Sequence, residues 1–263
     1  MYDRSVLLQK LFEEYEIDFL PFGTKQDKLG DVMEEYCARL LSWRHMLMKA
    51  QNNDLDLNNI DDYLYSSIVE SANIDISNVE SMEATRNVQH RMTGGNSKTD
   101  VILTVTYPTE IIKVPISIKQ TTVAKVAMAE FDAETIFREV GITDPIVKEL
   151  ILKHQIDASA INFTSEEKAL LTEHLAPYAR SFVRWVLTGA AKPTDDLRYP
   201  EIMVKFDMSR DDEIRDVLVF DIECYVDSVM YNKNGTPKSG GFGTGLSWTY
   251  ATGSKGRKIQ FKG

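Results

Sequence analysis

Two short segments between residues 100 and 119 constrain the fold of this chain more than any other feature. The segments "DVILTVT" and "IIKVPISIK" both alternate apolar and polar residues, which is typical of β-strands with one buried face. The link between them, "YPTE", contains a proline suited to a tight turn. The two segments are therefore predicted to pair as an antiparallel hairpin, with Val101 opposite Ile116 and Asp100 opposite Ser117.

This pairing sorts the side chains of the hairpin onto two faces, because successive residues of a strand point to opposite sides. One face is entirely aliphatic and is predicted to be core: Val101, Leu103, Val105, Ile112, Val114, Ile116 and Ile118. On the other face Asp100 and Ser117 lie together, and Lys119 is diagonally beyond, within reach of a long side chain. Pro115 in the second strand predicts an edge position or a bulge there.

The rest of the chain shows helical and extended patterns in turn. Apolar residues at three- and four-residue spacing predict helices over residues 5–17, 28–50, 63–72 and from 128 to about 190. A Thr164–Glu167 capping-box pattern marks one helix start. Strands are predicted at 200–206 and 215–222, before a glycine-rich loop at 234–245. The order of elements indicates an α/β fold with α+β character.

Composition excludes several classes of protein. The 263 residues, 43% of them hydrophobic, are enough for a substantial core, and no apolar run approaches the roughly 18 residues of a membrane span. The first residues, "MYDRSVLLQKLFEEY", do not have the pattern of a signal peptide. Cys37 and Cys224 lie far apart without metal-binding spacing, which fits a reducing cytoplasm and excludes a zinc cluster. The four histidines are scattered and are predicted to be surface or packing residues.

The charge of the chain is distributed unevenly. Residues 233–263 hold five lysines, one arginine and no acid, so this tail carries +6 and leaves −16 for the other 232 residues of a chain whose net charge is −10. A basic tail that also contains glycine and aromatic residues is typical of a surface that binds nucleic acid. A solvated terminus without a ligand is the alternative interpretation.

The polar end of the hairpin contains the residue types that phosphodiester hydrolysis needs. A carboxylate can hold a divalent cation on the phosphate, and a lysine beside it can orient water and offset developing negative charge. Asp100 and Lys119 could equally form an ordinary cross-strand ion pair. The layout resembles the PD-(D/E)xK nuclease core, and "GDVMEE" adds the G-x-x-x-E pattern often found on the first helix of such folds, with Glu34 facing the site.

Longer stretches of the chain resemble the MspI family of type II restriction endonucleases. The likeness is strongest in "GFGTGLSWTYATGSKGRKIQFKG" and continues, in family order, in "GGNSKTD", "KVAMAEFDAETI", "VGITDPIVKELILKHQ" and "YARSFVRWVLT". It implies a mixed sheet flanked by helices, with a helical insertion and a basic C-terminal tail. One endonuclease domain over 1–263 is expected, in segments 1–93 (helices), 94–127 (catalytic strands), 128–191 (helical), 192–232 (further strands) and 233–263 (tail).

The resemblance also implies an activity. The expected reaction is Mg²⁺-dependent cleavage of double-stranded DNA at 5′-CCGG-3′, after the first C, by an enzyme that is monomeric on DNA. A cognate DNA methyltransferase is expected in the same system, without a stable complex. No membrane association is expected, and the expected location is the cytoplasm.

Roles carry over from the family residue by residue. Asp100 and Lys119 correspond to the metal carboxylate and the catalytic lysine, Glu34 to the helix carboxylate, and Ile118 to a further metal ligand. Ser117 departs from the pattern, since the wider superfamily has Glu or Asp there and the MspI-like sequences have Asn. The base-reading positions are Thr249, Thr252, Gln260 and Lys262, and further DNA contacts are expected from Lys98, Lys255, Arg257 and Lys258.

Two features of the family pattern are altered or ambiguous. The stretch "QTTVAKVA" after Lys119 is less polar than in the family, which predicts the loss of some DNA contacts. Trp248 and Tyr250 could stack on bases, but they are predicted to anchor the tail against the rest of the protein. Besides an active endonuclease, the sequence leaves open a DNA-binding protein with an impaired metal site, or a protein whose basic tail meets an acidic partner.

Overall fold

The computed structural model describes residues 5–90, 97–123, 125–209, 211–251 and 253–263. The chain divides into two compact units, one made of Met1–Ala124 with Asp195–Ile222 and the other of Lys125–Thr194 with Glu223–Gly263. Each unit therefore contains two separate stretches of sequence. The division cuts across the predicted segments 94–127 and 192–232, while a single endonuclease domain over 1–263 stays a prediction.

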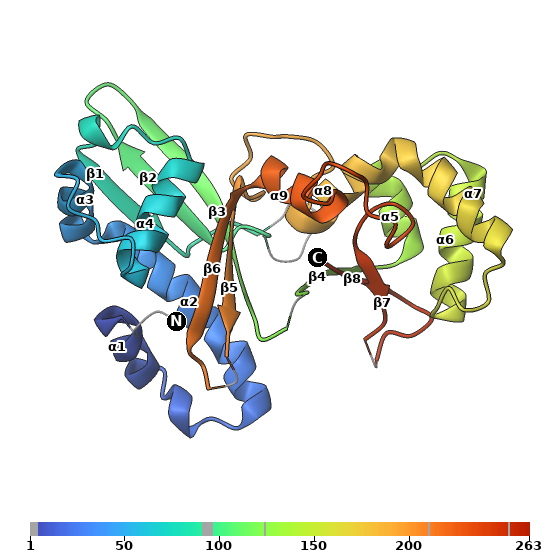
Figure 1. The fold of residues 1–263 in the computed structure, drawn as a ribbon, viewed down its shortest axis with the longest axis horizontal. Helices are drawn as coiled ribbons and strands as arrows, with labels where there is room; N and C mark the ends of the chain where they lie inside the picture. The colour runs from blue at the N-terminus through green and yellow to red at the C-terminus, as the bar shows by residue number, and fades with distance from the viewer. Residues whose placement is uncertain (1–4, 91–96, 124, 210, 252) are drawn as a thin grey trace. The chain divides into compact units, whose positions relative to one another are not determined.

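The first unit is built on a five-stranded sheet in the order β1-β2-β3-β5-β6 (Figure 1). Only β3 and β5 are parallel, and the other neighbours are antiparallel, so the sheet is mixed as predicted. Its strands are β1 (Ser81–Thr85), β2 (Val101–Thr106), β3 (Ile111–Thr121), β5 (Ile202–Met208) and β6 (Ile214–Asp221). β1 was not anticipated from the sequence.

The predicted hairpin forms with the predicted register. Val101 pairs with Ile116, and the ladder continues without a shift to Thr106 opposite Ile111. Neither expectation for Pro115 is confirmed: the ladder has no bulge there, and β3 is not an edge strand because it lies between β2 and β5. The Pro115 carbonyl accepts a hydrogen bond from the Glu201 backbone N–H at 2.8 Å, so the proline nitrogen also faces β5, just before that ladder begins at Ile116.

The aliphatic face of the hairpin is the centre of the first unit's core. All its residues are buried except Ile112, which is partly buried against the same cluster. The helices that contribute to this core are α1 (Val6–Glu14), α2 (Phe22–Ser42), α3 (Arg44–Gln51) and α4 (Ile60–Ser71), with 3₁₀ turns at Ile17–Phe19 and Ile76–Asn78. The helix predicted over 28–50 is two helices, because Trp43 adopts an extended conformation between them.

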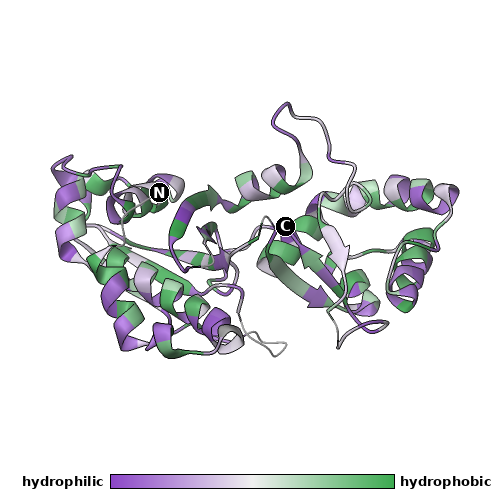
Figure 2. Cartoon of the chain, turned by 60° about the horizontal axis from the view of Figure 1, so that its bottom comes forward, coloured by the Kyte–Doolittle hydropathy of each residue, from purple (hydrophilic) through white to green (hydrophobic). Residues whose placement is uncertain are grey.

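The second unit combines helices with a small sheet. Its helices are α5 (Ala133–Val140), α6 (Pro145–Asp157), α7 (Ser165–Leu175), α8 (Ala179–Thr188) and most of α9 (Ile222–Met230), with a 3₁₀ turn at Ala176–Tyr178. The predicted capping box at Thr164 and Glu167 is confirmed. The helices carry both hydrophobic and hydrophilic residues (Figure 2). No helix among the described residues has the length and apolar character needed to cross a membrane.

The small sheet corrects two expectations. Its strands are β4 (Ala127–Phe131), β8 (Ile259–Lys262) and β7 (Ser247–Thr249), in the order β4-β8-β7. The region from residue 128 onward therefore begins as a strand, not a helix, and part of the basic tail is also extended. β4 pairs with a strand about 130 residues away, and pairing over such a separation leaves no local sequence pattern. The glycine-rich stretch 234–245 is irregular, as predicted.

Candidate functional site

Asp100 is the hub of the polar cluster at the end of the hairpin. Its Oδ2 accepts hydrogen bonds from the Ser117 hydroxyl at 3.0 Å, the Ile118 backbone N–H at 2.6 Å and the Lys119 ammonium at 2.9 Å. The Lys119 Nζ atom also donates to the Ile118 carbonyl at 2.8 Å. The hairpin therefore brings together the three side chains that the sequence predicted to meet.

Local folding explains why these groups converge. Asp100 lies just before β2, and its backbone N–H donates to the Ile116 carbonyl at 2.9 Å, so the pairing of β2 with β3 extends to the carboxylate. Ser117 is fully buried, whereas the side chains of Asp100 and Lys119 are 16% and 22% exposed. Ser117 is thus shielded from solvent, whereas the two charged groups remain partly accessible.

A second carboxylate, Glu34 of α2, belongs to the same electrostatic environment. Burial is the main cause that raises the pKa of Glu34, and the charge of Asp100 raises it further. The Arg86 guanidinium opposes both effects, because it donates to the Glu34 carboxylate at 2.8 and 3.2 Å. The charge of Lys119 acts in the same direction as Arg86. Glu34 therefore lies near the Asp100 cluster, as the sequence predicted.

Arg86 is a participant that sequence reasoning missed. Besides Glu34, its guanidinium contacts Asp31 at 3.4 Å and Glu35 at 3.5 Å, so one cation offsets three acids of α2. Arg86 follows β1 directly and is about 50 positions from these partners. No local pattern could have indicated the contact, but an arginine after a strand that packs on an acidic helix is a recognisable feature once β1 is known.

The donor atoms at this site have the chemistry that Mg²⁺ prefers. They are all oxygens, from the Asp100 carboxylate, the Ser117 hydroxyl and the Ile118 carbonyl, with Glu34 nearby. Among the described residues no three His, Cys, Asp or Glu side chains come together as a metal site. The residues therefore fit a hard cation held by one or two carboxylates, which takes its other ligands from water and substrate.

Lys205 shares the polar face of the sheet with this cluster and was also missed. It pairs with Lys119 in the parallel β3–β5 ladder, and paired residues point to the same side. Lys205 is half-buried, and burial lowers the pKa of its ammonium while Asp207 raises it. The face of the sheet that holds Asp100 thus carries two lysines, side by side on the neighbouring strands β3 and β5.

The predicted base-reading residues meet on the small sheet of the second unit. Thr249 pairs with Gln260 and Ser247 with Lys262, so these four side chains share one face. The Thr249 hydroxyl lies 3.2 Å from both the Gln260 carbonyl oxygen and its Oε1. We call Ser247, Thr249, Gln260 and Lys262, together with Glu130, which pairs with Gln260 from β4, the polar face of the small sheet. All five are half-buried.

Aromatic packing beneath this sheet confirms the predicted anchoring of the tail. The Trp248 ring packs edge-on against Phe182, Phe242 and Phe261, with ring centroids 5.6, 5.1 and 5.3 Å apart. The Tyr250 ring stacks on His154 at 5.7 Å. Trp248 and Tyr250 therefore both contact other parts of the second unit.

His154 is a packing residue, as the sequence predicted for the histidines. Tyr250 donates its hydroxyl proton to the His154 carbonyl, so His154 Nδ1, 2.7 Å from that hydroxyl, is the donor of the second bond. Burial lowers the pKa of His154 to about 4, which keeps the ring neutral at physiological pH. This pair of bonds fixes Tyr250 directly after β7.

The other predicted DNA contacts vary in exposure. Lys255, Arg257 and Lys258 are exposed in the turn before β8, as expected for side chains that bind phosphates. Lys98 lies two residues before Asp100 and is half-buried, with its backbone N–H donating to the Arg198 carbonyl at 3.3 Å. Thr252 lies outside the described residues.

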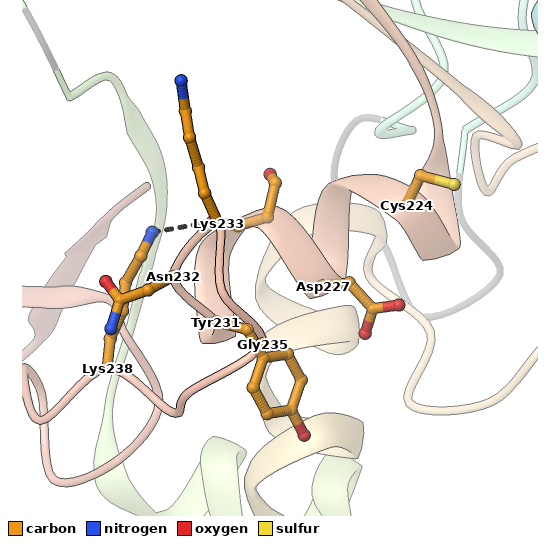
Figure 3. A pocket seen from close by; sticks show the side chains of 8 residues that line it. Cys224, Asp227, Tyr231, Asn232, Lys233, Gly235 and Lys238 are labelled. Carbon is orange, nitrogen blue, oxygen red and sulfur yellow. Dashed lines mark hydrogen bonds between the residues drawn. The ribbon is translucent and has the colours of Figure 1, made fainter.

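A separate hollow of about 770 Å³ lies beside α9 (Figure 3). Its lining includes Asp227, which pairs with Arg180, and Lys238, whose ammonium donates to the Ser228 carbonyl at 2.7 Å. Both charged side chains therefore already have a partner within the second unit. Neither cysteine forms a disulfide with a residue that the structure describes: Cys37 is buried in the core, and Cys224 is exposed and lines this hollow. The hollow contains none of the predicted site residues.

Comparisons with known proteins agree on one family. The family model described as restriction endonuclease MspI matches residues 7–263. The type II restriction enzyme MspI of Moraxella sp. is 36% identical over 266 residues, which cover 99% of this chain and 100% of that protein. The crystal structure of restriction endonuclease MspI in complex with its cognate DNA superposes with a TM-score of 0.89 at 35% identity, covering 99% of this chain and 100% of the other.

Proposed function

Since the chain belongs to the MspI family of restriction endonucleases, we propose that it cleaves double-stranded DNA at 5′-CCGG-3′, after the first C, with Mg²⁺ as cofactor. The observation that carries this proposal is the convergence of Asp100, Ser117 and Lys119 at the end of β3. The proposed sites are Asp100, Ser117 and Ile118 for the metal, and Lys119 and Glu34 for catalysis.

The metal and the protein divide the chemistry between them. When bound, Mg²⁺ would polarise the scissile phosphate and make water more acidic. Asp100 would hold the cation through its carboxylate, with the Ile118 carbonyl and the Ser117 hydroxyl as further oxygen donors. Glu34 adds negative charge next to this position, and Arg86 keeps its carboxylate oriented.

Lys119 acts on the reacting atoms. Its ammonium is held by Asp100 and the Ile118 carbonyl, 2.9 and 2.8 Å away, so it is in place before DNA arrives. From there it donates to the attacking water or to a phosphate oxygen, where negative charge grows in the transition state. Water attacks phosphorus and gives up a proton to solvent, the phosphorus–oxygen bond to the neighbouring sugar breaks, and the leaving oxygen takes up a proton from another water molecule.

The polar face of the small sheet is the proposed reading surface. Lys262 can donate to guanine O6 and N7, Gln260 offers a donor and an acceptor, and Thr249 can do either. Thr252 is the fourth proposed reader. Lys98, Lys255, Arg257 and Lys258 supply phosphate contacts that position the duplex without reading its sequence.

A digest of sequenced phage DNA tests this function directly. With Mg²⁺ present, every mapped end is expected at 5′-CCGG-3′ after the first C, and a chelator is expected to stop cutting. Ends that map to another tetranucleotide would overturn the CCGG assignment and leave the endonuclease activity in place. Ends scattered without sequence preference would overturn the assignment as a restriction enzyme.

The second candidate function is a DNA-binding protein with an impaired metal site. The observation that favours it is Ser117, whose short neutral side chain is fully buried and already bonded to Asp100. Specific binding to a CCGG duplex without cleavage, at Mg²⁺ or Mn²⁺ concentrations up to saturation, would select this function over the first.

A further inference from the structure

Glu130 is an acid on a surface that otherwise suits DNA. It pairs with Gln260 in the β4–β8 ladder, and Gln260 pairs with Thr249 in the β8–β7 ladder. Residues directly opposite one another in antiparallel strands point to the same side. The carboxylate of Glu130 therefore stands in one row with two proposed base-reading side chains.

This carboxylate has an unmet hydrogen-bonding requirement. Its Oε1 atom is buried and accepts no hydrogen bond from any residue that the structure describes. A buried carboxylate oxygen without a donor is costly, so it calls for a donor from outside the described residues, such as water or a bound ligand. The Glu130 side chain as a whole is half-buried, and rotation about its last bond exchanges the two carboxylate oxygens, so Oε1 is not confined to its buried position.

The negative charge of Glu130 argues against a side chain that is only solvated on this surface. DNA presents a dense row of phosphates, and an acid on the contact surface repels them unless it receives a hydrogen bond from the nucleic acid. Only base edges supply such donors. In the major groove the amino group of cytosine is the donor that glutamate pairs with.

Resting on the proposed function, we propose that Glu130 is a further specificity-determining residue, which accepts a hydrogen bond from the N4 amino group of a cytosine in the recognition site. A C·G pair presents this donor beside the guanine acceptors. In this row Glu130 offers an acceptor, and Gln260 and Thr249 each offer both a donor and an acceptor. This combination complements a C·G pair. Thymine has a hydrogen-bond acceptor, O4, at the same position. Two acceptors, O4 and the carboxylate, would then face each other without a proton between them.

Glu130→Gln tests this assignment, because it keeps the size of the side chain and replaces one oxygen by a donor. The control is Glu134→Gln, an exposed glutamate in the first turn of α5 that carries the same charge. Each protein is tested for binding and single-turnover cleavage on a CCGG duplex, on duplexes with one C·G pair changed to T·A, and on unrelated duplex.

The expected result is a loss of discrimination at one base pair. In Glu130→Gln the preference for C·G over T·A at that pair should fall on the order of tenfold or more, the scale of one good base contact. Unrelated duplex should bind the variant at least as tightly as wild type, because a repelling charge is gone. Glu134→Gln should keep the full preference.

Two outcomes would overturn the proposal. In one, both variants change affinity equally on all duplexes, which makes Glu130 a solvated charge. In the other, Glu130→Gln alters only the melting temperature, which makes the residue structural. Absence of sequence-specific cutting or binding by the wild-type protein would instead refute the proposed function itself, so the two failures are distinguishable.

Discussion

Replacing Ser117 by aspartate would give the metal site a second carboxylate where it now has a hydroxyl. Ser117 is fully buried and its Oγ lies 3.0 Å from Asp100 Oδ2, so the new carboxylate would be in hydrogen-bonding range of an existing one. Without a cation the two negative charges repel each other in a poorly solvated place. An uncompensated buried charge costs about 3–5 kcal/mol.

The steric part of this cost can be separated from the charge. Asparagine is nearly the same size as aspartate but has no charge. Ser117→Asn therefore carries only the cost of overpacking, about 1–3 kcal/mol. The difference between the two variants isolates the charge repulsion, which Lys119 reduces because its ammonium lies 2.9 Å from Asp100. We expect Ser117→Asp to be about 2 kcal/mol less stable than Ser117→Asn without metal, or roughly 4–8 °C in melting temperature.

Added Mg²⁺ should reverse the order of stability, so that Ser117→Asp becomes more stable than Ser117→Asn. A cation at one hundred times its dissociation constant stabilises the folded state by about 2.7 kcal/mol, and the two carboxylates bind it more tightly than one. Melting curves at increasing Mg²⁺ measure this stabilisation, and initial cleavage rates give the Mg²⁺ concentration for half-maximal activity. We expect the largest melting shift for Ser117→Asp, and a lower half-maximal concentration for both variants than for wild type. If Mg²⁺ raises all three melting temperatures equally and no half-maximal concentration falls, Ser117 is not a metal ligand.

Three further changes test other parts of the site. Lys119→Ala should abolish detectable cutting while duplex affinity stays within a few fold, because the lysine acts mainly in the transition state; near wild-type cutting would refute its role. Replacing Lys255, Arg257 and Lys258 by alanine should flatten the slope of log affinity against log salt by about 2 to 3 on any duplex, and an unchanged slope would mean that these side chains do not contact phosphates. Glu34→Gln should raise the melting temperature at pH 8, because a raised folded-state pKa means that wild type loses stability as pH rises through it. That gain should vanish below about pH 4, where Glu34 is protonated in both the folded and the unfolded chain, and a gain independent of pH would refute the argument.

The sequence was most informative where partners are close along the chain. The register of the hairpin, its aliphatic face and the meeting of Asp100 with Ser117 and Lys119 all follow from alternation and a short turn. The capping box at Thr164 is equally local. These features could be predicted because strand pairing across a few residues leaves few alternative arrangements.

The small sheet shows the opposite case. β4 carries "AMAEF" directly before a well-capped helix, and nothing in those five residues indicates a partner at the end of the chain. Glu130 meets Gln260 only after that pairing forms. Arg86 was missed because the preceding strand β1 was not predicted. Lys205 was missed because its strand was predicted but the pairing of that strand with β3, far away along the chain, was not. The family resemblance predicted Thr249, Gln260 and Lys262 as readers, and the β7–β8 ladder places these three side chains on one face.

The uneven charge of the chain leads to a last prediction about salt. At physiological ionic strength charges are screened beyond about 8 Å, so a duplex bound at the tail, as we propose, is attracted by its +6 while most of the remaining −16 is screened from it. At 0.01 M salt the screening length grows to about 30 Å, and repulsion from the acidic residues reaches the duplex. Log affinity for unrelated duplex should therefore rise linearly as salt falls and then level off toward 0.01 M. Fluorescence anisotropy with a labelled duplex measures this curve, and a straight line to the lowest salt would mean that the acidic residues lie too far from the DNA to matter.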